Sequence, residues 1–174
     1  MVNLSDYVAS IRDFPTEGIL FRDITPILQA PEAFRTATKM LAEYGRKVGA
    51  DVIVGPESRG FIFGCPTAVE MGIGFVPVRK PGKLPRETYS MEYELEYGTS
   101  TLELHKEDIQ KGQKVLLVDD LLATGGTMEA MIKLVEMCGG EVAGVLVLME
   151  LEGLEGRKKI ADYRLDSAIK YPGK

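Results

Sequence analysis

The sequence predicts a single α/β domain whose mainly parallel, twisted sheet is flanked by helices. Short aliphatic runs alternate with helical spacing along the 174 residues, of which 45% are hydrophobic, enough for one core at this length. The aliphatic run 115–118 stands between Lys114 and Asp119, which is typical of a strand buried on both faces of a parallel sheet. We expect one domain over 1–174, with a small hood formed by the N-terminal arm and a flexible loop and hairpin.

Two helices are predicted in the N-terminal part of the chain, one before and one after an apolar segment. Apolar spacing over 4–14 predicts a short amphipathic helix that ends at the following proline. The apolar segment 18–26 has no clean period, so an arm pinned to the core and a binding segment both remain open interpretations. A second helix is predicted over 31–44, with Gly45 and Gly49 helping to end it.

Strands and helices then alternate. The expected elements are strands at 51–54, 75–78 and 142–148, helices at 61–71 and 128–138, and a hairpin over 89–105. Pro77 leaves the register of its strand open, because proline cannot donate a ladder hydrogen bond. The one histidine, His105, follows a strand among charged residues and is expected on the surface. Ile160 and Tyr163, in the weakly patterned tail after Leu151, are expected to cover an edge.

Composition restricts the class of protein. The net charge of −5 argues against nucleic-acid binding. No apolar run reaches the roughly 20 residues of a membrane span and no signal peptide is apparent, so a cytoplasmic protein with no membrane partner is expected. Cys65 and Cys138 have no C-x-x-C pairing or nearby histidine, and we expect both to be buried free thiols.

The segment 119–127 combines two acids with a small, glycine-rich loop. Asp119 and Asp120 follow the buried strand, and ligands of parallel sheets bind beyond the carboxyl ends of the strands. The glycines let backbone N–H groups approach an anion, and the helix predicted after Thr127 favours phosphate at its N-terminus. Because carboxylates repel phosphate, the two acids suit sugar hydroxyls or hydrated Mg²⁺. The segment therefore predicts a site for a sugar phosphate.

Other interpretations of this segment differ in strength. A Walker A loop is excluded because no Gly-Lys-Ser/Thr follows, and the Gly-x-Gly-x-x-Gly of dinucleotide folds is missing. A plain strand-to-helix turn capped by an aspartate stays open as the simpler alternative.

Residues 118–127, Val-Asp-Asp-Leu-Leu-Ala-Thr-Gly-Gly-Thr, resemble the signature by which type I phosphoribosyltransferases bind phosphoribosyl pyrophosphate (PRPP). The resemblance implies that Asp119 and Asp120 hold the ribose 2- and 3-hydroxyls. It also implies a cradle for the 5-phosphate, made by Ala123, Thr124, Gly125, Gly126 and Thr127.

Two further segments could bind anions. Residues 55–60 form a second strand-to-helix loop, with backbone donors and Arg59 available, although a plain turn explains it equally well. Residues 79–86 are basic and rich in proline and glycine. They form either a solvated loop or a mobile lid that closes over a polyanion. A nucleic-acid patch is disfavoured, since the tract is short.

Four more segments, 18–25, 57–61, 78–85 and 95–98, resemble motifs of the adenine phosphoribosyltransferases and occur in that family's order. The resemblance implies transfer of the 5-phosphoribosyl group from PRPP to adenine, giving AMP and pyrophosphate in purine salvage. It also implies Mg²⁺ as cofactor, bound through PRPP with Asp119 and Asp120 as its candidate ligands, and usually a homodimer.

Site residues follow from the resemblance and from the chemistry. Glu96 is the expected catalytic residue, donating a proton to purine N7; it is preferred to Glu92 because only Glu96 lies in Leu-Glu-Tyr-Gly. The expected pyrophosphate-binding residues are Glu57, Ser58, Arg59, Arg79, Lys80 and Lys83. The expected adenine-binding residues are Leu20, Phe21 and Arg22, with Leu151 on the opposite face of the ring.

Two rival functions remain open. A regulatory PRPP sensor usually carries a DNA-binding extension, and this sequence shows none. A xanthine-type transferase is disfavoured by the segment around Phe21 and by the Leu-Glu-Tyr-Gly motif. A backbone carbonyl and a backbone N–H near Leu20–Arg22 suit adenine and would be left unpaired by a 6-oxopurine.

Overall fold

A computed structural model describes residues 2–95 and 98–173, and its centre is a five-stranded sheet in which neighbouring strands are parallel. In spatial order the strands are β4 (Gly74–Val78), β3 (Val52–Pro56), β7 (Lys114–Leu122), β8 (Glu141–Leu151) and β9 (Leu165–Tyr171). The predicted α/β fold class is confirmed.

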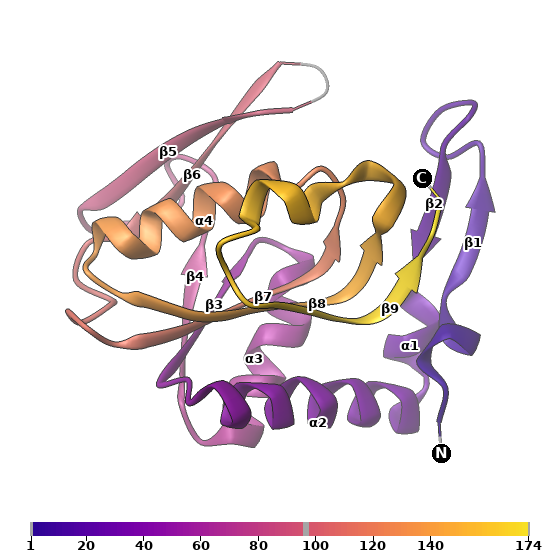
Figure 1. Cartoon of the computed structure of the whole chain (residues 1–174), viewed down its shortest axis with the longest axis horizontal. Coiled ribbons are helices and arrows are strands. Elements are labelled where there is room, and N and C mark those ends of the chain that lie inside the picture. The colour runs from indigo at the N-terminus through magenta and orange to yellow at the C-terminus, as the bar shows by residue number, and fades with distance from the viewer. Residues whose placement is uncertain (1, 96–97, 174) are drawn as a thin grey trace.

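Helices cover both faces of this sheet (Figure 1). One face carries α1 (Thr25–Gln29), α2 (Pro31–Val48) and α3 (Arg59–Met71), and the other carries α4 (Gly126–Met137). Short 3₁₀ helices are η1 (Leu4–Tyr7), η2 (Glu152–Leu154) and η3 (Gly156–Ile160). Two antiparallel hairpins, β1 (Ala9–Arg12) with β2 (Leu20–Asp23) and β5 (Thr88–Glu94) with β6 (Thr99–His105), stand at opposite ends of the sheet in Figure 1.

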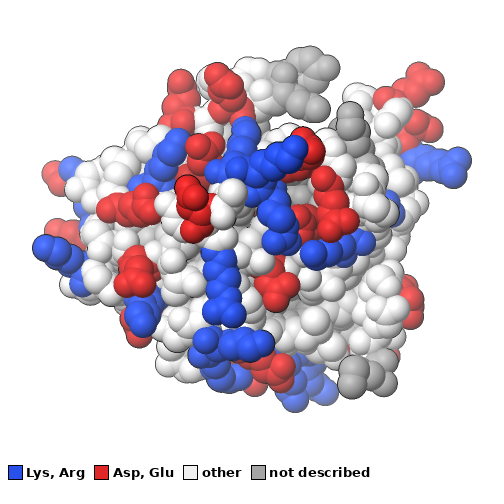
Figure 2. Space-filling view, in the orientation of Figure 1, with Lys and Arg blue, Asp and Glu red and all other residues white. Residues whose placement is uncertain are grey.

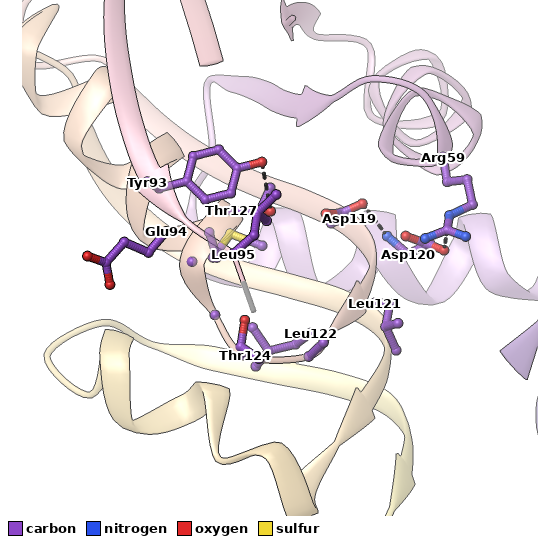
Figure 3. Close-up of a pocket in the computed structure, with 14 residues that line it drawn as sticks. Arg59, Tyr93, Glu94, Leu95, Asp119, Asp120, Leu121, Leu122, Thr124 and Thr127 are labelled. Carbon is purple, nitrogen blue, oxygen red and sulfur yellow. Dashed lines mark hydrogen bonds and ion pairs between the residues drawn. The ribbon is translucent and has the colours of Figure 1, made fainter. Parts of the chain in front are cut away.

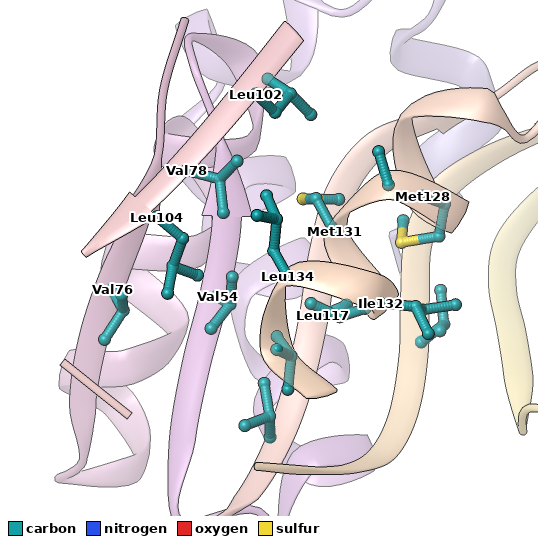
Figure 4. Packing of buried hydrophobic residues seen from close by; sticks show 14 of the residues in the cluster. Val54, Val76, Val78, Leu102, Leu104, Leu117, Met128, Met131, Ile132 and Leu134 are labelled. Carbon is teal, nitrogen blue, oxygen red and sulfur yellow. The ribbon is translucent and has the colours of Figure 1, made fainter. Parts of the chain in front are cut away.

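Strand β7 lies in the middle of the sheet because its residues are apolar on both faces. Leu116 and Val118 pack into the cluster beneath α2 and α3, whereas Val115 and Leu117 pack into the cluster beneath α4. Figure 4 shows the second cluster, where α4 lies on β3 and β7. Each such side chain contributes about 1.5–3 kcal/mol on burial, so the strand that carries the two acids is firmly held.

Helix α2 begins at Pro31 as predicted and runs one turn further than expected. Gly49, with φ of 70°, ends it in the left-handed conformation, which glycine adopts at little cost. Gly45, predicted to help end the helix, instead lies inside it and is buried. A Cβ there would lie 2.5 Å from the Met71 sulfur, so glycine permits close packing of α2 against α3.

The predicted helix over 4–14 is wrong beyond its first turn. The helix η1 ends at Tyr7, and the following residues form β1, which pairs with the apolar segment after Gly18 in an antiparallel hairpin. The physical reason is a tertiary partner that helical spacing cannot reveal. Pro77 lies on β4, an edge strand, opposite Gly55, which settles its register.

Three expectations about exposure are also wrong. His105 is only 6% exposed, because its ring lies beneath Arg86 and Asp108. Cys65 is exposed although both cysteines are free, as expected. Ile160 and Tyr163 were expected to cover a sheet edge. Instead β9 forms the edge on that side of the sheet, and Ile160 is buried beside α4.

None of the helices in the described ranges has the length and apolar composition needed to cross a membrane. Acidic and basic side chains are interspersed on the face shown in Figure 2. The net charge of −5 is therefore not gathered into one uniform field on that face.

Candidate active site

The pocket at the end of β7 is built by the two acids and the loop that leads into α4. Asp119 and Asp120 lie near the carboxyl end of the strand, and Gly125 takes φ of 84° where the backbone turns into the helix. That conformation favours glycine. The cavity has a volume of about 190 Å³ and is lined by Arg59, Tyr93, Glu94, Leu95 and residues 119–128. All seven residues predicted to bind the ribose and 5-phosphate therefore lie together (Figure 3).

The two aspartates form a poorly compensated pair. Burial and the neighbouring Asp120 charge raise the pKa of Asp119 well above its ordinary value. Burial also raises the pKa of Asp120, although Arg59 opposes that shift. Because both pKa values are raised, the folded protein disfavours the charged form of each aspartate. Ligands that bring hydroxyl donors or a cation would relieve this cost.

Arg59 joins the acid pair to the second predicted loop. Its Nε lies 2.8 Å from Asp120 Oδ2, as Figure 3 shows, and its guanidinium carbon lies 5.9 Å from the centre of the Phe21 ring. A second cavity of about 410 Å³ adjoins the first and shares Asp119 and Asp120 with it. Its lining also includes four predicted pyrophosphate-binding residues, Glu57, Ser58, Arg59 and Lys80.

The basic loop after β4 makes three of its contacts with the carboxylate of Glu57. Glu57 accepts hydrogen bonds from Arg79 Nε at 3.3 Å, from the Lys80 N–H at 2.7 Å and from Lys83 Nζ at 2.9 Å. Burial raises the pKa of Glu57, but these donors outweigh burial and hold the pKa below its ordinary value. The predicted pyrophosphate residues are thus brought together, with Glu57 as the acceptor among them.

The predicted adenine residues lie on a separate part of the fold. Phe21 on β2 packs edge-on against Phe14 at 5.1 Å between ring centres. Arg22 stacks over Tyr171 at 3.9 Å and donates to Ser10. Leu151 ends β8 and is buried. None of Leu20, Phe21, Arg22 and Leu151 lines either of the two cavities described above, and Arg59 provides the link to Phe21.

The predicted catalytic residue, Glu96, lies outside the described residues. The residues before it, Glu94 and Leu95, line the first cavity. The Leu95 N–H donates to the Gly98 carbonyl at 2.9 Å. The end of β5 thus lies beside the loop formed by residues 123–127, which lines the same cavity.

Tyr93 is a site residue that sequence reasoning missed. It lines both cavities, and the Thr127 hydroxyl donates to its phenol oxygen over 3.5 Å. The alternation of tyrosine and leucine with glutamate along the predicted hairpin placed Tyr93 on one face, but it did not show which element that face would meet.

Comparison with known proteins identifies the family. Residues 23–173 match the phosphoribosyl transferase domain. Adenine phosphoribosyltransferase of Lachnoclostridium phytofermentans is 56% identical over the full length of both proteins. That of Lactobacillus gasseri is 55% identical, covering 99% of this protein and 98% of the relative.

The chain belongs to the adenine phosphoribosyltransferase family.

Solved structures agree with this membership. The crystal structure of the Thermoanaerobacter pseudethanolicus family member has a TM-score of 0.93 and 53% identity, covering 97% of this protein and 98% of its own length. The Saccharomyces cerevisiae enzyme, crystallised with an iminoaltritol bisphosphate and adenine, has a TM-score of 0.89 and 42% identity, covering 95% and 96%. The family's architecture therefore extends through the sheet, the hairpins and the tail.

Proposed function

We propose that this protein transfers the 5-phosphoribosyl group from PRPP to adenine, giving AMP and pyrophosphate in purine salvage. One observation carries the proposal: an acid pair and an anion-binding loop meet at the carboxyl end of β7, in a protein more than half identical to adenine phosphoribosyltransferases over its whole length. We propose that residues 1–174 form a single transferase domain.

The first cavity suits the ribose 5-phosphate part of PRPP. Asp119 and Asp120 accept hydrogen bonds from the ribose 2- and 3-hydroxyls, which relieves the cost that raises their pKa values. The backbone N–H groups of 123–127, with the hydroxyls of Thr124 and Thr127, hold the 5-phosphate at the start of α4. Support comes from the joint lining of one cavity by all these residues.

The adjoining cavity suits the departing pyrophosphate. Arg59, Ser58 and the backbone near Glu57 would hold the anion, and Arg79, Lys80 and Lys83 would add charge from the basic loop. Positive charge aimed at a departing polyanion stabilises the transition state more than the ground state. In the described structure the loop already lies beside this cavity through Glu57.

The carboxylates of the site suit Mg²⁺ that is bound together with PRPP. Among the described residues, no three histidine, cysteine or acidic side chains are grouped to hold a metal, but Mg²⁺ commonly binds through one or two carboxylates together with substrate phosphates. We propose Asp119 and Asp120 as these carboxylates. Burial disfavours their charges and raises their pKa values, which supports a cation nearby. When bound, Mg²⁺ neutralises charge on pyrophosphate.

Adenine binding is assigned to β2 and the end of β8. The backbone of Leu20 to Arg22 would pair with the base edge, Phe21 would stack on the ring, and Leu151 would cover its other face. The contact of Arg59 with Phe21 supports a base site next to the pyrophosphate site. Glu96 is proposed to donate a proton to purine N7 while the N9 proton leaves to water, which frees N9 to attack the ribose, and to take the N7 proton back once the N9–ribose bond has formed.

We further propose a homodimer that works in the cytoplasm. Val69 on α3 is 82% exposed and Met40 on α2 is also exposed, and a second copy packed on these helices would bury both side chains. Two free cysteines are in keeping with a reducing compartment.

The test is formation of AMP and pyrophosphate from PRPP and Mg²⁺, with adenine, hypoxanthine, guanine and xanthine supplied separately to the purified protein. Turnover of adenine alone is expected. Turnover of a 6-oxopurine would overturn the base assignment on β2 while leaving the phosphate site intact. Binding of PRPP without any turnover would overturn the enzymatic proposal in favour of a sensor.

A further inference from the structure

The tail segment after β8 contacts the backbone of the phosphate loop directly. A Cβ on Gly125 would lie 2.6 Å from the Gly156 carbonyl oxygen, and a Cβ on Gly156 would overlap the Ala123 carbonyl and lie 2.9 Å from the Gly125 nitrogen. Real Cβ atoms are not found so close to backbone. The two glycines thus pack backbone against backbone.

Gly156 touches this loop without lining the cavity that the loop encloses. Residues 123–126 line the first cavity, whereas Gly156 is buried behind them. In Figure 1 the yellow segment that carries η3 lies on the same face of the sheet as α4. The loop therefore has the proposed phosphate on one side and a tail residue on another.

Next to Gly156 in the sequence, Arg157 forms an ion pair with the buried carboxylate of Glu150. Arg157 donates from Nε to Glu150 Oε1 at 2.8 Å and from Nη2 to Oε2 at 2.6 Å. Arg157 Nη1 also donates to the Leu165 carbonyl at 3.2 Å, and the Ser167 hydroxyl donates to Glu150 at 2.8 Å. Two parallel bonds fix the guanidinium in direction as well as distance, so β8 and β9 together fix the start of η3.

The other end of η3 is anchored in the core. Ile160 is 1% exposed and belongs to the same apolar cluster as Leu122 and Met128, the residues on either side of the phosphate loop. Close-packed interiors transmit displacement instead of absorbing it. A shift of η3 would therefore displace the 123–126 loop.

We propose that Gly156 is a positioning residue for phosphate binding: clamped to β8 and β9 through Arg157, its backbone supports the 123–126 loop and sets the spacing of the N–H groups that receive the 5-phosphate. This inference rests on the proposed function of the loop. Donors that are fixed in advance stabilise charge better than donors that must reorganise. Only glycine lets the supporting backbone approach this closely.

The decisive variant is Gly156→Ala, and Gly74→Ala is its matched control. A Cβ at Gly74, on the edge strand β4, would meet only Val52 at 3.8 Å. Neither glycine has the positive φ that penalises alanine. The measurements are the calorimetric affinity for ribose 5-phosphate and the KM values for PRPP and adenine. Melting temperatures are recorded for both variants.

The expected result is a loss of about 10–10²-fold in ribose 5-phosphate affinity and a similar rise in KM for PRPP, with KM for adenine unchanged. Gly74→Ala should leave all three values unchanged. Loss of melting temperature with unchanged ribose 5-phosphate affinity would overturn the inference, because it would make Gly156 a packing residue only.

A second variant decides the matter if Gly156→Ala fails to fold. Arg157→Lys keeps the positive charge but loses the paired hydrogen bonds, so a smaller loss of ribose 5-phosphate affinity is expected, and an unchanged affinity would overturn the inference. The binding measurement separates this inference from the proposed function. Wild-type protein that binds ribose 5-phosphate but forms no AMP overturns the reaction alone, whereas wild-type protein that binds no ribose 5-phosphate overturns both.

Discussion

Two buried carboxylates on neighbouring strands, Asp120 of β7 and Glu150 of β8, are treated in opposite ways by the fold. They are 4% and 3% exposed. Glu150 receives two hydrogen bonds from Arg157 and one from Ser167, which lower its pKa. Asp120 has one contact with Arg59 and lies beside Asp119, and its pKa is raised by burial.

The difference distinguishes a carboxylate that stabilises the fold from one that remains able to bind a ligand. A carboxylate whose lone pairs are satisfied inside the protein has nothing left to offer a ligand, and it stabilises the fold. A carboxylate that stays underpaired costs the empty protein stability and keeps its binding capacity for a partner from solution. On this criterion Glu150 holds the tail, whereas Asp119 and Asp120 keep the capacity to bind a ligand, which supports the proposed ribose site.

The strongest test is the double variant Asp119→Asn/Asp120→Asn. Under the proposed function each acid positions the ribose. Since misplacement costs about 10²-fold, losing both acids should reduce kcat/KM for PRPP by about 10⁴-fold. Steady-state kinetics give this number. Urea unfolding without ligand should show equal or greater stability than wild type, since two unfavourable charges are gone. Unchanged PRPP affinity would contradict the ribose assignment.

A third carboxylate extends the comparison from binding to chemistry. Glu96→Gln should lower kcat by about 10²–10⁴-fold with the fold intact, because glutamine cannot donate the proton to purine N7. The matched control is Glu92→Gln, which changes the neighbouring Glu-Tyr pair and should leave kcat unaltered. If the control alone lost activity, the assignment would belong to Glu92.

The opposite outcome is expected where the carboxylate is structural. Arg157→Met leaves Glu150 buried without its main partner and should lower the unfolding free energy by about 1–3 kcal/mol, a range that allows for the partly exposed guanidinium. Adding Glu150→Gln to this variant should recover part of the loss. Chemical denaturation measures both. A loss that the second substitution deepens would show that the pair acts in some other way.

The contributions of Glu150 and of the Asp119–Asp120 pair to the unfolding free energy should change with pH in opposite directions. The pKa of Glu150 is lowered on folding, so its stabilisation is present above the ordinary value of about 4.3 and is lost as pH falls toward the folded pKa. The pKa values of Asp119 and Asp120 are raised, so their ionisation removes stability as pH rises above about 3.9. Urea midpoints from pH 3 to 7 should show the stability gain of Asp119→Asn/Asp120→Asn growing with pH, while the loss in Glu150→Gln appears only above acid pH.

The smallest effect is expected at the exposed ion pair between Lys158 and Glu155, 2.6 Å apart and next to Gly156. Lys158→Met should change the unfolding free energy by less than about 0.5 kcal/mol, because solvent screens such pairs. The same denaturation series checks this value. A loss as large as that of Arg157→Met would show that charge near η3, and not the paired hydrogen bonds between Arg157 and Glu150, holds the segment.

The contrast also explains what could be predicted from the sequence. The strand, acid pair, loop and helix of 115–137 are consecutive, so local pattern alone located this part of the site. Glu150 and Arg157 lie only seven residues apart, but their pairing depends on η2 and η3, and β9 was hidden in a weakly patterned tail. His105 is buried only because Arg86 and Asp108 meet over it. Partners supplied by tertiary structure leave no local periodicity.

The ion pairs of Glu57 with the basic loop have a consequence for turnover. Under the proposed function, pyrophosphate must compete with this carboxylate for Lys83 and Arg79, so its net affinity is reduced by the free energy of the contacts it displaces. The same reduction applies after the reaction, when pyrophosphate has to leave. Product release limits the turnover of many enzymes that close a loop over their substrate. By binding Lys83 and Arg79 again, the Glu57 carboxylate would speed the release of pyrophosphate.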